Sequence, residues 1–215
     1  FGGDVVEKAV VLVGADMPDL VAHGTGKHRL LRGIARTDDD VPGVAVVAHE
    51  AAPREGLERE AHTVAGGDIG DGAELPFRGG AFDVVYSSNV AEHIPDWRAM
   101  GEEMVRVAKP GGLVVLSYTV WLGPFGGHET GLWQHYVGGD YARRRYAKVH
   151  GHEPKNVFGE SLFAVSAREG LEWAEGTGQL AAAFPRYHPW WAWWVTRVPL
   201  LREFAVSNLV LVLRA

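Results

Sequence analysis

The stretch AELPFRGGAFDVVYSSNVAEHIPDW, residues 73–97, contains the pattern that decides the fold. A polar, glycine-containing turn precedes an apolar run at residues 82–86 that does not alternate with polar residues. Such a run is typical of a strand buried on both faces, as in a parallel sheet. Ser87, Ser88 and Asn89 follow it directly, at the end of the strand where open α/β sheets bind their ligands. The alternative is that these small polar residues cap the next turn.

Further apolar runs outside this stretch have the same character. They lie at residues 9–13 (AVVLV), 44–48 (VAVVA), 113–117 (LVVLS) and 208–213 (NLVLVL). Helical patterns lie between several of them. Strands that alternate with helices predict a parallel sheet with right-handed crossovers, the doubly wound, Rossmann-like α/β class.

Three segments have helical patterns, at residues 28–36, 96–108 and 166–176. The second is expected to begin with Asp96 as its N-cap and to end at the KPGG sequence of residues 109–112. In the third, Ser166 and Glu169 have the spacing of a capping box. In the sequence, one of these helices precedes the run at residues 113–117 and another follows it.

The composition limits the classes of function. The chain has 215 residues, of which 47% are hydrophobic and 22% charged, as expected for one globular domain. A net charge of −6 gives no reason to expect nucleic acid as a partner. The absence of cysteine excludes disulfides and thiolate metal sites and agrees with a cytoplasmic location. No apolar run has membrane-spanning length, and because the sequence begins at Phe1, a longer natural N-terminus is expected.

Residues 121–162 differ from the rest of the chain. They contain no apolar strand run and are rich in glycine, histidine and tyrosine. We expect them to form a cap over the carboxyl edge of the sheet, within a single domain that comprises residues 1–215.

The order of the motifs resembles the class I S-adenosyl-L-methionine-dependent methyltransferases of the small-molecule type. In that family a GDAEDLPF-like turn precedes an FDVV strand, and an EH pair, a helix and KPGG follow. This chain has GDGAELPF at residues 70–77, FDVV at 82–85, EH at 92–93 and KPGG at 109–112. Later segments resemble an actinobacterial subgroup, among them SYTVWLGPFGGHE at 117–129 and FPRYHPWWAWW at 184–194. The resemblance implies the class I methyltransferase fold, a mainly parallel sheet with an antiparallel C-terminal strand.

The resemblance also implies a cofactor, S-adenosyl-L-methionine, and residues that bind it. Asp71 is expected to accept a hydrogen bond from the adenine amino group, with the Gly72 amide near the ring. Glu50 is expected to bind the two ribose hydroxyls. The linked motifs favour a place for Ser88 and Asn89 beneath the methionine part of the cofactor. A turn aspartate and a surface glutamate are the alternatives for Asp71 and Glu50.

The glycine-rich loop of the family has two candidates in this sequence. Gly24 and Gly26, in AHGTGKHRLL at residues 22–31, resemble the family's loop but follow a poor strand. The alternative begins with the better strand at residues 10–14 and uses Gly14, Ala15 and Asp16, without a glycine pair. We favour Gly24 and Gly26, because glycines allow the backbone to approach the cofactor closely.

Histidine is the natural general base if the methyl acceptor must lose a proton. His128 and Glu129 follow the run at residues 113–117, at the ligand edge of the sheet, and His135 lies a little further along the expected cap. We take these three as candidate catalytic residues. Hydrogen bonding within a glycine-rich loop is the alternative for His128, and a structural role is expected for His93.

A metal site is not expected from the sequence. His150, His152 and Glu153 form the pattern HGHE, but alternating histidines in a loop without further ligands are usually solvated or hydrogen-bonded.

Four tryptophans, at positions 190, 191, 193 and 194, form the densest aromatic segment of the chain. The favoured interpretation is a helix that begins at Pro189 and packs on the sheet. A wall of the substrate pocket is the second, and contact with a membrane surface is the least favoured.

The function indicated by these patterns is transfer of a methyl group from S-adenosyl-L-methionine to a small, hydrophobic or aromatic acceptor. The alternative is a non-catalytic domain of the same fold that binds a cofactor or a partner. A nicotinamide-dependent oxidoreductase is disfavoured, because the chain lacks a clean G-x-G-x-x-G motif.

Overall fold

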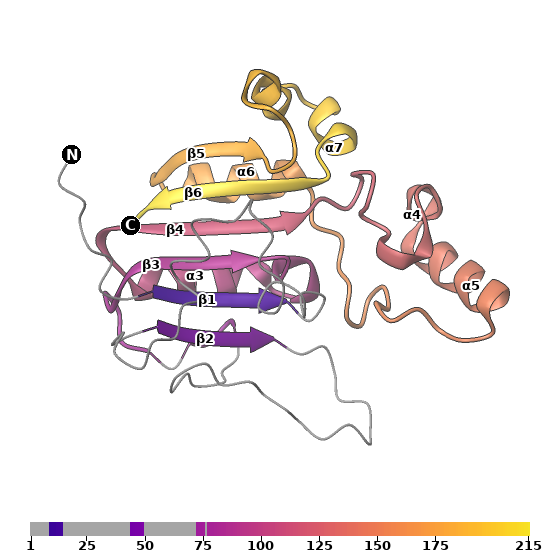
Figure 1. Ribbon diagram of the computed structural model, residues 1–215, viewed down its shortest axis with the longest axis horizontal. Coiled ribbons are helices and arrows are strands. Elements are labelled where there is room, and N and C mark those ends of the chain that lie inside the picture. Colours follow the sequence, from indigo (N-terminus) through magenta and orange to yellow (C-terminus); the bar gives the residue numbers. More distant parts are fainter. Residues whose placement is uncertain (1–8, 15–43, 50–71, 76) are drawn as a thin grey trace.

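The computed structural model describes residues 9–14, 44–49, 72–75 and 77–215. Six strands of this part form one sheet in the order β2-β1-β3-β4-β6-β5 (Figure 1). The first four strands are mutually parallel, namely β1 (Ala9–Gly14), β2 (Val44–His49), β3 (Phe82–Ser88) and β4 (Ala108–Thr119). β6 (Asn208–Arg214) runs antiparallel to β4, and β5 (Leu180–Pro185) antiparallel to β6. The expected mainly parallel sheet with an antiparallel C-terminal strand is confirmed.

All five apolar runs identified in the sequence are strands, but β5 was not predicted. Its sequence, LAAAFP, contains three alanines, which have low strand propensity. The strand forms at the sheet edge because Ala182, Ala183 and Phe184 pair with the apolar residues of β6. The KPGG sequence also differs from the expectation: the preceding helix ends at Val107, and KPGG belongs to the start of β4.

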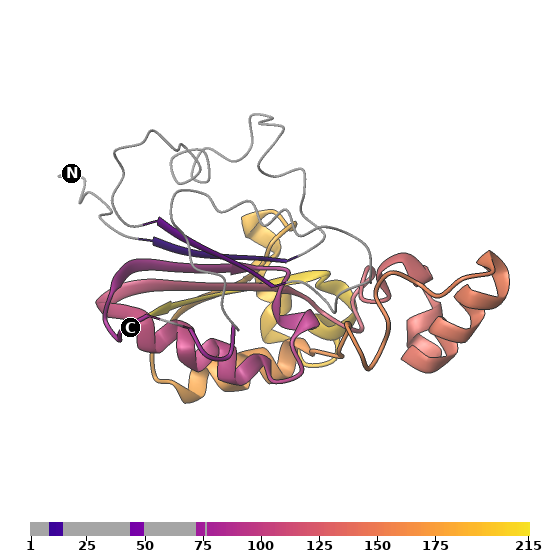
Figure 2. The ribbon, with the colours of Figure 1, turned by 90° about the horizontal axis from the view of Figure 1, so that it is seen from below.

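Two amphipathic helices, α3 (Trp97–Val107) and α6 (Ala167–Gly176), cover the same face of the sheet (Figure 2). Asp96 caps α3 as expected, its carboxylate accepting a hydrogen bond from the Ala99 amide at 3.1 Å. The two helices approach closely at Gly101, where a Cβ atom would come within 2.4 Å of the Trp173 ring. The predicted helix at residues 28–36 lies outside the described residues.

The core lies between these helices and the sheet. Leu116 and Tyr118 of β4 and Leu211 of β6 are fully buried beside Met100 and Met104 of α3. Burying a side chain of this size stabilises the fold by about 1.5–3 kcal/mol. The core therefore fixes β3, β4 and β6 relative to one another, and these three strands bring the site residues together.

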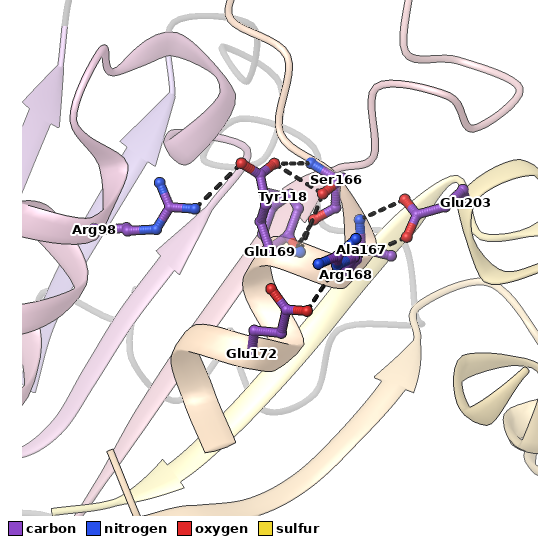
Figure 3. A network of polar contacts seen from close by, with 8 residues as sticks. All are labelled: Arg98, Tyr118, Ser166, Ala167, Arg168, Glu169, Glu172 and Glu203. Carbon is purple, nitrogen blue, oxygen red and sulfur yellow. Dashed lines mark hydrogen bonds and ion pairs between the residues drawn. The ribbon is translucent and has the colours of Figure 1, made fainter. Parts of the chain in front are cut away.

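The N-terminus of α6 is held by two carboxylates (Figure 3). Ser166 and Glu169 form the predicted capping box. Glu203, from the short helix α7 (Leu201–Ala205), accepts hydrogen bonds from the backbone amides of Ala167 and Arg168, both at 2.8 Å. Negative charge at a helix N-terminus is favourable, so Glu203 ties the C-terminal region to the helix layer.

Residues 121–162 lie beyond the carboxyl ends of β3 and β4 and project away from the sheet (Figure 1). This fully described segment contains helices and no strand, as expected from its sequence. Its elements are a 3-10 turn, η2 (His128–Thr130), and the helices α4 (Gln134–Val137) and α5 (Gly139–His150).

The tryptophan-rich segment forms a 3-10 helix, η3 (Trp190–Arg197), and the prediction that it packs on the sheet is wrong for most of its rings. Trp190 is 79% exposed and Trp191 65% exposed. Trp193 stacks on a strand residue, Phe184 of β5, at 4.4 Å between ring centroids, and among the described residues no other tryptophan of η3 does so. Within the described part of the chain, no helix is long and apolar enough to cross a membrane.

Candidate active site

Three strand ends meet at one edge of the sheet. β3 and β4 end there, and β6 begins there because it runs in the opposite direction. A cavity of about 500 Å³ opens at this edge. It is lined by Asn89, His93, Thr119, Phe125, His128, Tyr187, Ser207 and Asn208.

A chain of hydrogen bonds links Ser117 to two residues that line this cavity, Asn208 and Asn89. The Ser117 hydroxyl donates to Asn208 Oδ1 at 2.5 Å, and Asn208 Nδ2 donates to Asn89 Oδ1 at 2.8 Å. Asn89 has a φ of 54°, a left-handed conformation that asparagine tolerates better than most residues. Its backbone amide donates to the Ser117 carbonyl at 2.8 Å. The network therefore fixes the turn that follows β3.

Ser87 and Ser88 belong to the last residues of β3, next to β1, where Leu12 and Val13 are their register partners. Arg186 Nη1 donates to Ser88 Oγ at 2.8 Å. Ser87 is fully buried, and its hydroxyl has no hydrogen-bond partner within the described residues. A buried hydroxyl without a partner is unfavourable, so this position suits a polar ligand group.

A second group of side chains comprises His93 and His128, which line the same cavity, and the buried Glu92. Glu92 and His93 end the 3-10 turn η1 (Ala91–His93), and His128 begins η2. The rings of His93 and His128 lie 5.3 Å apart between centroids, at an interplanar angle of 74°. The Glu92 carboxylate is 1% exposed and accepts a hydrogen bond from the Thr119 amide at 3.0 Å.

Glu129 follows His128 in η2. Its carboxylate accepts two hydrogen bonds from Asn156, from the backbone amide at 2.7 Å and from the side-chain amide at 2.9 Å. Glu129 lines a second cavity of about 510 Å³, shared with His128, Tyr146 and His152. The paired hydrogen bonds give Glu129 a role in holding the loop that carries His128.

His135, the third candidate catalytic residue, lines neither cavity. It is 1% exposed, and its Nε2 lies 3.1 Å from the Gly123 carbonyl oxygen. Burial lowers the pKa of His135, and the hydrogen bond to the Gly123 carbonyl opposes this effect. These contacts give His135 a structural role in the segment 121–162.

Among the expected cofactor-binding residues, Gly24, Gly26, Glu50 and Asp71 lie outside the described residues. Gly72 is described and packs tightly, since a Cβ atom there would come within 3.1 Å of Ile94 Cδ1. β1 ends at Gly14 and is the strand of the second loop alternative.

Sequence reasoning missed several residues of the site. Arg186, Tyr187 and Asn208 come from segments far from the motif region, and Glu92 was noted only as part of the EH pair. One signal was available for Asn208: an antiparallel last strand must begin at the edge where the parallel strands end.

Comparison with known proteins identifies the family. Residues 23–116 match a family model described as a methyltransferase domain. An uncharacterized methyltransferase of Mycobacterium sp. strain KMS is 62% identical over 174 residues, which cover 80% of this chain and 68% of that protein. The chain belongs to the methyltransferase family. A relative from Mycobacterium tuberculosis strain H37Rv, also an uncharacterized methyltransferase, is 67% identical over 142 residues, 66% of this chain and 56% of that protein.

Solved structures agree with this assignment at the level of the fold. An S-adenosylmethionine-dependent methyltransferase from Mesorhizobium loti superposes with a TM-score of 0.52 at 16% identity, over 99% of this chain and 93% of that one. Geranyl diphosphate C-methyltransferase from Streptomyces coelicolor gives a TM-score of 0.53 at 13% identity, over 99% of this chain and 72% of that one. The methyltransferase therefore has the class I fold.

Proposed function

We propose that this methyltransferase transfers a methyl group from S-adenosyl-L-methionine to a small acceptor with hydrophobic or aromatic character. The observation that carries the proposal is the cavity at the carboxyl edge of the sheet, where small polar side chains of β3 and β6 lie next to two histidines. In open α/β sheets this edge is where ligands bind.

The residues at this edge suit the cofactor. The buried Ser87 hydroxyl lacks a partner in the described part of the chain, and Ser88 and Asn89 add hydrogen-bonding groups beside it. A solved structure of the same fold, the Streptomyces geranyl diphosphate enzyme, contains S-adenosyl-L-homocysteine. We assign Asp71 to the adenine, Glu50 to the ribose, and Gly24 and Gly26 to the loop beneath the cofactor.

When bound, the cofactor supplies an electrophilic methyl group on its sulfonium sulfur. The side chains of the protein have the task of binding the acceptor, orienting it and excluding water. His93 and His128 line the cavity, so the acceptor lies against their rings, and His128 is the candidate for taking its proton. Glu129 and His135 then act as positioning residues.

The character of the acceptor follows from the rest of the lining. Phe125 and Tyr187 contribute aromatic surface, and both rings are also partly open to solvent. Thr119, Asn89 and Asn208 contribute the polar groups that would orient one end of the acceptor. Aromatic hydroxyl compounds and apolar carboxylic acids combine these two features.

Calorimetric titration with S-adenosyl-L-methionine and with S-adenosyl-L-homocysteine tests the proposal. Saturable binding of both is expected, and Asp71→Ala and Glu50→Ala should each weaken it at least about fivefold, because removal of a hydrogen bond to a bound group typically costs about 1–3 kcal/mol. Glu74→Ala serves as the matched control, since Glu74 is exposed in the same turn.

The outcomes separate the enzyme from its rival. Binding of the cofactor justifies a screen of aromatic hydroxyls and apolar acids as methyl acceptors. If the folded protein binds neither compound, the non-catalytic alternative replaces the proposal. If Asp71→Ala and Glu50→Ala bind like the wild type, the cofactor lies elsewhere.

A further inference from the structure

Three potential metal ligands converge beside the cavity. One ligand atom from each of Glu92, His93 and His128 can be chosen so that all three lie within 4.8 Å of one another. The residues come from two separate 3-10 turns, η1 and η2, that meet at the ligand edge of the sheet. Two histidines and one carboxylate are a common ligand set for first-row divalent metals.

The hydrogen bond of His93 to the Ser161 carbonyl leaves its other ring nitrogen, Nε2, able to bind a metal. Its Nδ1 lies 2.6 Å from the Ser161 carbonyl oxygen, which can only accept, so Nδ1 carries the proton. The lone pair is therefore on Nε2, which has no hydrogen-bond partner among the residues that the structure describes. Histidines that bind metals usually donate their other ring N–H to a carbonyl or carboxylate in this way.

The Glu92 carboxylate provides an independent indication. Its side chain is 1% exposed, and one oxygen accepts the hydrogen bond from the Thr119 amide. The other oxygen, Oε2, is buried and lacks a hydrogen-bond partner in the described part of the chain. A buried carboxylate oxygen without a partner is costly, and a cation bound at this point would compensate it.

The surroundings leave one side of the cluster open. His93 and His128 line the cavity of about 500 Å³, whereas Glu92 lies buried behind them. Three protein ligands with an open position toward a cavity are the arrangement of catalytic metal sites, in contrast to closed structural sites with four protein ligands.

We propose that Glu92, His93 and His128 bind one first-row divalent transition metal ion, through a Glu92 carboxylate oxygen, His93 Nε2 and a ring nitrogen of His128. The open position of the metal faces the cavity and is suited to an oxygen atom of the acceptor. Binding of the acceptor by the metal rests on the proposed function, whereas binding of the metal by the protein does not. In this arrangement His128 is a metal ligand and does not take the proton of the acceptor.

The metal is measured without cofactor or acceptor. The tag-free protein is treated with chelator, passed into buffer, and titrated with Zn²⁺ and with Co²⁺, whose visible absorption reports the ligand geometry. We expect one saturable site. Glu92→Gln and His128→Asn should each weaken its affinity at least roughly tenfold, the lower limit seen even for loss of a group that only orients a ligand. Asparagine is chosen at position 128 because His128 has a φ of 47°, which asparagine tolerates.

His150→Gln is the matched control, because His150 is an exposed histidine at the end of α5, outside the cluster. It should bind Zn²⁺ and Co²⁺ like the wild type. Circular dichroism confirms that each variant is folded, and His128→Asn remains informative if Glu92→Gln does not fold.

Two results would overturn the metal site. One is the absence of saturable Zn²⁺ or Co²⁺ binding by the folded wild type; the other is unchanged binding in His128→Asn. Titration with S-adenosyl-L-methionine in the presence of chelator is independent of the metal, so failure of the proposed function is recognised separately.

Discussion

Asn208, the first residue of β6, joins the ends of two other strands: its side chain accepts a hydrogen bond from Ser117 of β4 and donates one to Asn89 after β3. Asn208 is 3% exposed, and the bond between Ser117 and Asn208 is buried. The chain reaches this arrangement only because β6 runs antiparallel to β4, which places residue 208 beside residue 119 at the ligand edge.

Replacing Asn208 should therefore destabilise the protein. Asn208→Ala leaves the buried Ser117 hydroxyl without its acceptor, which costs about 1–3 kcal/mol, and it also removes the hydrogen bond to the half-buried Asn89 Oδ1. We expect a decrease of about 1–3 kcal/mol in the free energy of unfolding, measured by urea denaturation. In the double variant Ser117→Ala/Asn208→Ala the cost should be smaller than the sum of the single costs, because one orphaned group is removed. Strictly additive costs would show that the bond between Ser117 and Asn208 does not contribute.

The turn before β3 is fixed to α3 by Glu103 and Arg106. Glu103 Oε2 accepts a hydrogen bond from the Leu75 amide at 2.9 Å, and Arg106 donates to the carbonyls of Leu75 and Phe77. The hydrogen bond from Arg106 lowers the pKa of Glu103, and the Leu75 amide adds to this effect, while burial opposes it. The ionised carboxylate therefore helps to hold the turn that contains Gly72.

The lowered pKa gives a prediction with a definite sign. A carboxyl group whose pKa is lower in the folded state stabilises the fold above its unfolded pKa, here about 4.5, and loses that contribution as the pH falls through the folded value. Between pH 6 and pH 3 the wild type should lose more stability than Glu103→Gln, and at pH 7 the variant should be the less stable protein.

Glu102→Gln is the control for this prediction, since Glu102 is exposed on the same helix. It should follow the wild type at every pH in a series of urea denaturations. Parallel pH curves for the wild type and Glu103→Gln would contradict the role of Glu103.

The parts of the fold that the sequence predicted depend on local signals. Asp96 and the capping box of Ser166 act within three residues of their partners, and the central strands are recognisable from unbroken apolar runs. β5 could not be recognised, because pairing with β6 overrides the low strand propensity of its alanines.

The candidate site also contains some residues that the sequence predicted and others that it did not. Ser88 and Asn89 could be predicted because they lie at the end of an apolar run, and His128 because it lies in the loop after the next run; the structure places all three at the ligand edge. Their hydrogen-bond partners could not be predicted from the sequence. Arg186 follows the edge strand β5, and it reaches Ser88 of β3 only through the order in which the strands pair in the sheet. His135 shows the converse: its position after β4 suggested catalysis, but packing on Trp121 buries it.

The burial of His135 has a consequence for stability against pH. Because burial lowers its pKa, the unfolded state takes up the proton first as the pH falls below about 6.5. The free energy of unfolding should therefore decrease as the pH falls from 7.5 to 5.5. A difference of one unit between the folded and unfolded pKa values limits this decrease to about 1.4 kcal/mol. His135→Gln should show a flatter dependence over this range in thermal or urea unfolding.

Methyl transfer provides a second readout for the same variant. A positioning role predicts that His135→Gln, assayed at a temperature where it is folded, keeps the wild-type pH profile of kcat. His150→Gln, with an exposed side chain, should match the wild type in both measurements. A pH profile that changes in His135→Gln would restore His135 to the list of catalytic candidates.

The tryptophans of η3 differ in burial, and substitution should reveal the difference. Trp193 is 40% exposed and stacks on Phe184 at an interplanar angle of 16°, whereas Trp190 is 79% exposed. Aromatic pairs of this kind contribute about 0.5–1.5 kcal/mol beyond the area that they bury. Trp193→Ala should therefore lower the free energy of unfolding by about 1–2 kcal/mol, and Trp190→Ala should change it by less than about 0.5 kcal/mol. The two substitutions remove the same side chain from the same helix, so each is the control for the other in urea denaturation. Equal losses of 1 kcal/mol or more in both variants would mean that Trp190 is packed in solution, as the amino-acid sequence alone had suggested.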